Sequence, residues 1–75
     1  MEQYQNLSGD SGVVAYEIGD DSITVEFSRG GVYRYDYESA GREAIEHMKE
    51  LARAGRGLNS YINRTVKQQF AEQIR

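Results

Sequence analysis

The chain contains no cysteine, no proline and no tryptophan among its 75 residues. Without cysteine it can form neither a disulfide framework nor a thiolate metal site, which suits a reducing compartment. No apolar run approaches the ~18 residues that a membrane span needs. The first residues, MEQYQNLSGD, carry neither a basic segment nor an apolar run, so we expect no signal peptide. These absences predict one small soluble domain in the cytoplasm, with no membrane partner.

The formal net charge is -3, which argues against strong non-specific DNA binding because such binding needs a positive field. The charge is unevenly distributed along the chain. Residues 1–41 hold eight acidic residues and two arginines, whereas residues 42–75 hold seven basic and four acidic residues. This asymmetry indicates a surface directed toward a partner; the alternative is charge scattered for solubility.

Alternating patterns predict three β-strands after a loose, polar N-terminal arm at residues 1–11. The strands are GVVAYEI at 12–18, SITVEFS at 22–28 and VYRYDY at 32–37. Asp20-Asp21 and the segment Arg29-Gly30-Gly31 supply residues typical of tight turns. We therefore predict an antiparallel meander of three strands.

The tyrosines at 33, 35 and 37 share one face of the last predicted strand. A two-residue turn at 20–21 and a three-residue turn at 29–31 place the large apolar residues of all three strands on one face. The predicted pairs are Val14–Phe27, Tyr16–Val25, Ile18–Ile23, Phe27–Tyr33, Val25–Tyr35 and Ile23–Tyr37, with Glu26 opposite Arg34 on the other face. This register places the tyrosines in the core; the alternative is an exposed stacking platform, as in RNA-binding sheets.

The apolar period then changes to that of a helix. A first helix is predicted at about 40–54, with Ser39 as its N-cap and Gly55 in a left-handed conformation after its end. A second helix is predicted at about 58–73, with Leu58, Ile62, Val66 and Phe70 on its apolar stripe. The expected fold is therefore α+β: a three-stranded antiparallel β-meander followed by two α-helices packed on one face, all within a single domain at 12–75.

Two segments carry a family resemblance: F27-S-R-G-G-V-Y33-R-Y35 and, after a helix, G57-L58-N59-S-Y-I62-N-R64. Over about residues 12–70 the chain resembles the KTSC family, named for a module at the C-terminus of some lysyl-tRNA synthetases. The module also occurs in small stand-alone bacterial proteins. The resemblance implies that Tyr33 and Tyr35 are motif residues with a structural role, and that RNA binding is a function to consider. Members usually carry Val-Pro after the Tyr-x-Tyr strand, where this chain has Tyr37-Glu38-Ser39.

A basic patch beside the predicted hinge between the helices is the main candidate site. It comprises Arg53, Arg56, Arg64 and Lys67, all expected to be exposed, with Asn59 as a hydrogen-bonding residue. Free N–H groups at the start of the second helix would favour an anion there, and RNA or tRNA is the expected ligand. The alternative is that Asn59 only caps the helix and the cations keep it soluble.

Catalysis has little support in the sequence, and we expect neither enzymatic activity nor a cofactor. His47 is the single histidine, and with Glu43 it would provide only two ligands for a metal. A second binding hypothesis is a protein-interaction module or homodimer, because both outer strands of a three-stranded meander have unpaired edges.

Overall fold

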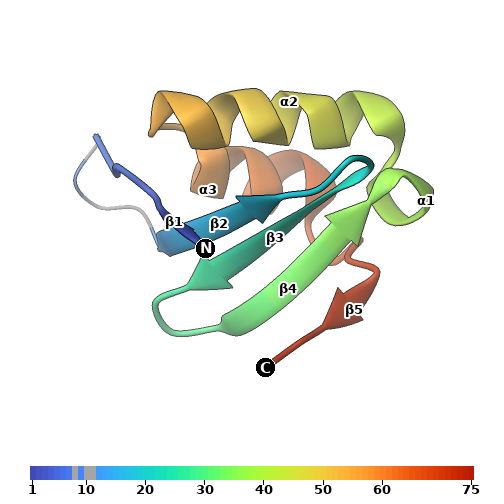
Figure 1. Ribbon diagram of the computed structural model, residues 1–75, viewed down its shortest axis with the longest axis horizontal. Helices are drawn as coiled ribbons and strands as arrows, with labels where there is room; N and C mark the ends of the chain where they lie inside the picture. Colours follow the sequence, from blue (N-terminus) through green and yellow to red (C-terminus); the bar gives the residue numbers. More distant parts are fainter. Residues whose placement is uncertain (8, 10–11) are drawn as a thin grey trace.

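A computed structural model describes residues 1–7, 9 and 12–75. Within these residues, strands β1 to β5 form one antiparallel sheet in the order β1-β2-β3-β4-β5, and the helices cover one of its faces (Figure 1). The elements are β1 Glu2–Gln3, β2 Val13–Ile18, β3 Ser22–Phe27, β4 Gly31–Asp36, α1 Tyr37–Ala40, α2 Arg42–Ala54, α3 Leu58–Tyr61, the π-helical turn η1 Ile62–Val66, and β5 Glu72–Gln73. The α+β class and the central meander are confirmed, and the structure adds two short edge strands and a third helix.

The β2–β3 hairpin has the predicted register next to its turn but not at its far end. Tyr16 lies opposite Val25 as predicted, and Ile18 lies opposite Ile23. A bulge between Val13 and Ala15 then breaks the alternation, so that Val13 rather than Val14 lies opposite Phe27. Val13 is buried and Val14 is 38% exposed. The extra residue of a bulge reverses the faces beyond it, which is why the prediction fails at this end.

The β3–β4 hairpin is shifted by two residues from the predicted register. Its loop is Ser28 to Gly30, so Val25 lies opposite Tyr33 and Ile23 lies opposite Tyr35. A shift of two keeps every side chain on its face because strands have a period of two. Tyr35 is therefore buried at 2% exposure, as the core interpretation predicted.

Two details of that register were predicted wrongly. Arg34 lies opposite Thr24, and Glu26 lies opposite Val32, so there is no Glu26–Arg34 pair. Tyr37 has left the strand and begins α1, because the Asp36 carboxylate accepts a bond from the Ser39 backbone N–H and caps that helix. Ser39 thus completes the cap of a short helix and is not the N-cap of α2.

Helix α2 ends as predicted, at Ala54, with Gly55 left-handed at φ 77°. The second predicted helix is shorter than expected: α3 and η1 together end at Val66, and Lys67 adopts φ 55°. The chain then turns back, and β5 pairs with Tyr33 and Arg34 of β4. The apolar stripe predicted a helix through residue 73, and this prediction is wrong for residues 67–73, which are not helical.

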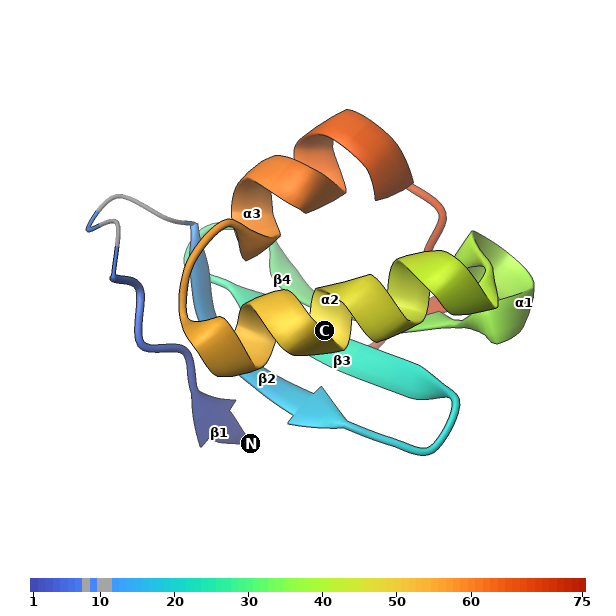
Figure 2. The same ribbon diagram turned by 90° about the horizontal axis from the view of Figure 1, so that it is seen from above.

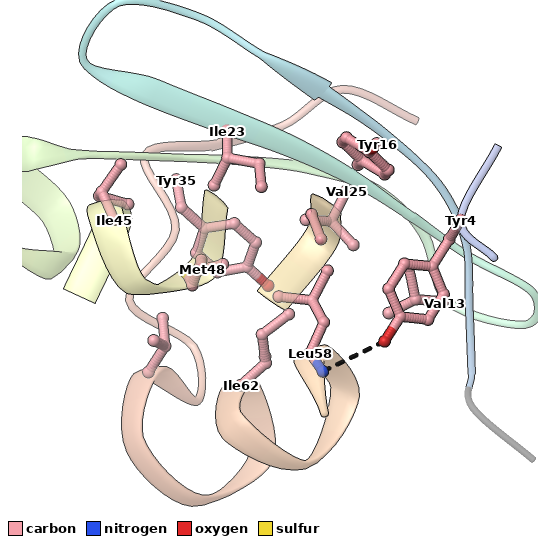
Figure 3. Packing of buried hydrophobic residues seen from close by; sticks show 12 residues of the cluster. Tyr4, Val13, Tyr16, Ile23, Val25, Tyr35, Ile45, Met48, Leu58 and Ile62 are labelled. Atoms are coloured by element: carbon pink, nitrogen blue, oxygen red, sulfur yellow. Dashed lines mark hydrogen bonds between the residues drawn. The ribbon is translucent and has the colours of Figure 1, made fainter. Parts of the chain in front are cut away.

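The N-terminal residues also differ from the loose arm expected over 1–11. Glu2 and Gln3 pair with β2, and Tyr4 is buried at 2% exposure. The Tyr4 hydroxyl accepts a hydrogen bond from the Leu58 backbone N–H at 3.3 Å, the dashed line in Figure 3. Residues 8, 10 and 11 of the predicted arm lie outside the described residues. Because β1 and β5 flank the meander, β2 and β4 are not the bare edges that the sequence predicted.

The core lies between the sheet and the helices. Figure 2 shows α2 and the α3 segment over the sheet, and Figure 3 shows Ile23, Val25 and Tyr35 pointing toward Met48 and Leu58. Among the described residues, no helix has the length and apolar character needed to cross a membrane.

Candidate functional site

A hollow of about 310 Å³ opens between the sheet and the last helical segment, and we call it the aromatic groove. Four rings line it: Phe27, Tyr33, Tyr35 and Phe70. The other lining residues are Ile62, Asn63, Lys67 and Gln68, which follow one another around the end of η1. The groove thus joins β3 and β4 to residues from the last part of the chain.

The four rings contact one another in a chain, in the order Phe27, Tyr33, Phe70 and Tyr35. The Tyr33 ring centroid lies 4.7 Å from that of Phe70 and 5.9 Å from that of Phe27. Tyr35 meets Phe70 edge to face at 6.3 Å. Such contacts contribute about 0.5–1.5 kcal/mol each beyond the area that they bury. Tyr33, Phe27 and Phe70 are all partly exposed, so part of this set faces solvent.

Tyr35 forms the inner wall of the groove. Burial raises the pKa of its hydroxyl to about 12, because the low-dielectric surroundings disfavour the tyrosinate, and Tyr33 adds to the shift. Tyr35 therefore stays neutral across the physiological range and keeps its O–H as a donor.

The backbone at the groove is unusual in two ways. Residues Ile62 to Val66 form a π-helical turn, closed by a hydrogen bond from the Lys67 N–H to the Ile62 carbonyl. Lys67 itself has φ 55° and ψ -116°, a conformation that favours glycine. Both π-turns and strained residues occur preferentially at functional sites. Their coincidence at the rim marks this end of the helix as the leading candidate site.

The four predicted cations, Arg53, Arg56, Arg64 and Lys67, are all exposed, as expected. Among the residues that the structure describes, none of the four forms an ion pair. They are not gathered into one phosphate-sized patch, however. The nine residues of α3 and η1 separate Arg56 from Lys67 by roughly 13 Å along the helix axis. Only Lys67 borders the aromatic groove.

The start of α3 also differs from the predicted anion site. Gly57, at φ 82°, is the N-cap in place of Asn59, and Asn59 is partly buried beside Gly12. The Leu58 N–H, one of the groups expected to be free, donates to the Tyr4 hydroxyl. This helix end is therefore partly satisfied from within the protein.

A second charged cluster holds the β2–β3 turn against α2. Lys49 is 5% exposed, and its ammonium group donates to the Asp20 carbonyl at 2.9 Å and pairs with Glu46 at 3.0 Å. The Tyr37 hydroxyl donates to Glu46 at 2.7 Å, which lowers the pKa of that carboxyl. These groups satisfy one another, so we interpret the cluster as structural.

His47 faces Glu50 at 3.7 Å and stacks edge to face on Tyr61, rather than meeting Glu43. Among the residues described, no group of three or more histidine and acidic side chains is placed to hold a metal.

The sequence did not single out the groove, although it placed Tyr33 and Tyr35 on the core face. Phe70 and Gln68 were missed as site residues because a helix through residue 73 would have carried them elsewhere, whereas Asn63 lies in the helical part that was predicted and carried no signal that set it apart. Comparisons with protein-family models, with curated proteins and with solved structures each found no match to this chain. The KTSC resemblance therefore stays a hypothesis.

Proposed function

We propose that this chain is a non-catalytic binding module and that its ligand is single-stranded RNA. The observation that carries the proposal is the aromatic groove with Lys67 at its rim, which forms no ion pair within the described residues, at the end of a helical segment that also bears the exposed Arg64. Single-stranded nucleic acids are bound by this combination, in which aromatic rings take bases and cations follow the backbone.

The charge distribution favours a single strand over a duplex. The net charge of -3 leaves no broad positive field, so the attraction is local to the second half of the chain. Unpaired bases can enter a groove and stack, whereas bases in a duplex cannot. We place the strand along α3 and η1, with a base in the groove beside Lys67 and phosphates toward Arg64 and Arg56.

The second hypothesis, an interaction through the edges of the predicted meander, has less support because both edges are partly covered. The β2 edge is met by β1 at Ala15 and Tyr16, and the β4 edge is met by β5 at Tyr33 and Arg34. A partner strand would have to displace these segments first. A mass that rises with concentration in light scattering would favour the homodimer instead.

The test is an anisotropy titration of a labelled eight-nucleotide RNA at 50 and 200 mM salt. We expect binding that weakens with salt, since each phosphate contact releases counterions. The double variant Arg56→Gln/Arg64→Gln should have a free energy of unfolding within about 1 kcal/mol of that of the parent. It should lower the salt dependence of RNA binding, the slope of log K against log salt, by about one for each lost phosphate contact.

Arg42→Gln is the matched control. Arg42 is an exposed arginine at the far end of α2, over the Tyr37 ring, and the proposed RNA path does not include it. Absence of binding at 50 mM salt refutes the proposal. Because the double variant removes two positive charges and the control removes one, a loss in the control that is half that of the double variant would show a non-specific charge effect.

A further inference from the structure

We propose that the aromatic groove is a nucleotide subsite, which takes one nucleobase against the Tyr33 and Phe70 rings and its phosphate on Lys67. The inference rests on the proposed function, because it names the unit of RNA that the groove holds. The same chemistry is present in a free nucleoside monophosphate and in a nucleotide within a strand.

The size and composition of the groove set the class of ligand. Its volume of about 310 Å³ lies at the lower end of the range for small-molecule sites, which suits one nucleotide rather than two stacked bases. Its aromatic lining favours a flat ring.

The charges at the groove decide between an anion and a cation. Aromatic cages commonly hold quaternary ammonium groups, but these use several rings without a competing positive charge. Here Lys67 stands at the rim, and no acidic residue lies among the described residues that line the groove. An anionic aromatic ligand is therefore favoured over a cationic one.

The remaining polar groups fit the edge of a base. Asn63 and Gln68 line the groove, and each amide both donates and accepts hydrogen bonds, as base edges do. Lys67 forms no ion pair within the described part of the chain. The negatively charged phosphate of the nucleotide would provide that partner.

The backbone at Lys67 provides a test that separates binding from folding. A glycine adopts φ 55° and ψ -116° without strain, so Lys67→Gly removes the ammonium group and relieves the backbone. If Lys67 serves the ligand, this variant should melt no lower than the parent and yet lose nucleotide binding. If Lys67 serves the fold, the variant should melt lower.

The experiment is an NMR titration of the labelled full chain with nucleoside monophosphates, the matching nucleosides and inorganic phosphate. We expect saturable shifts at the groove residues with monophosphates, at least about tenfold weaker binding of nucleosides, and no saturable shifts with phosphate alone. Lys67→Gly should reduce monophosphate affinity to that of the nucleoside, and Phe70→Leu should weaken both.

Arg42→Gln is the control, since Arg42 is an exposed arginine outside both the groove and the proposed RNA path, and it should leave monophosphate binding unchanged. No saturable shift at millimolar monophosphate, or unchanged affinity in Lys67→Gly, overturns the inference. If Lys67→Gly and Phe70→Leu both bind the RNA as tightly as the parent protein does, the subsite inference is also overturned, while the RNA-binding proposal survives. Monophosphate binding with no tighter binding of the eight-nucleotide RNA supports the subsite and refutes the strand.

Discussion

Tyr4 closes the core from the N-terminal side, and its removal is a direct test of the fold. Its ring is 2% exposed within the core cluster, its N–H donates to the Val14 carbonyl at 3.0 Å, and its hydroxyl accepts from the Leu58 N–H. Residue 4 thus connects the edge of the sheet to the first turn of α3. We expect Tyr4→Ala to destabilise the whole domain rather than to release a flexible end.

The size of the effect follows from the burial. Replacing a buried aromatic residue with alanine costs about 3–5 kcal/mol. The total stability of a domain this small is roughly 4–11 kcal/mol. Tyr4→Phe keeps the ring but leaves the buried Leu58 N–H without its acceptor, and because that bond is long we expect a cost of about 1 kcal/mol.

Urea unfolding followed by circular dichroism measures both variants. With a slope of about 1 kcal/mol per M, Tyr4→Ala should lower the midpoint by about 3 M or leave the chain unfolded in buffer. Gln3→Ala, an exposed neighbour in β1, should change stability by less than about 0.5 kcal/mol. A Tyr4→Ala protein with the parental midpoint would refute the reasoning. Fast exchange of the Tyr4 N–H with solvent in the parent protein would also contradict it, because it would show that this end of the chain is not held in the core.

Two further predictions concern pH and backbone. The pKa of Tyr35 is about 12 in the folded protein, against about 10 in the unfolded chain. This difference contributes about 3 kcal/mol to the free energy of unfolding, a contribution that is complete below pH 10 and is lost as the pH rises toward 12. Unfolding of Tyr35→Phe should therefore depend less on alkaline pH, and an identical dependence would contradict this. Gly31→Ala should cost more than about 1 kcal/mol, because φ is 88° and the added methyl group would overlap the Arg75 carbonyl oxygen. Gly30→Ala, whose φ is not positive, should cost less in the same thermal melts.

The sequence predicted which residues are buried better than it predicted which residues pair. Tyr35 was placed in the core although its partner was assigned two residues away, because a period of two fixes the face and not the neighbour. The bulge at Val14 could not be foreseen, since Val13 and Val14 are both suited to a buried strand position.

The C-terminal segment was mispredicted for a different reason. Phe70 follows Val66 by four residues and continues the helical stripe, and no proline or glycine marks an end at Lys67. In the structure Phe70 still covers the core face, but it reaches Tyr33 and Tyr35 from a reversed chain. Phe70 would cover the core face both from a continued helix and from a chain that turns back, so its apolar character does not decide between them. The tertiary contacts of β5 select the reversed chain.

The exposed cations of the candidate site were predictable one by one, because charged residues on a helix stay in solvent. Their arrangement was not. The nine residues of α3 and η1 separate Arg53 and Arg56, near the hinge, from Lys67, whereas the hinge was expected to gather all four cations.

The aromatic groove depends on the segment that the sequence failed to predict. Phe70 stands between the strained turn at Lys67 and β5, so its ring is held by anchors on both sides. On the β5 side the anchors are backbone hydrogen bonds from Ala71 to Arg34 and from Ile74 to Val32, both of 2.7 Å, together with the ion pair of Glu72 with Arg34 at 2.8 Å. Weakening these bonds loosens a wall of the groove without touching its remaining lining. The edge strand therefore protects the sheet and, at the same time, positions the ring on which the proposed base would stack.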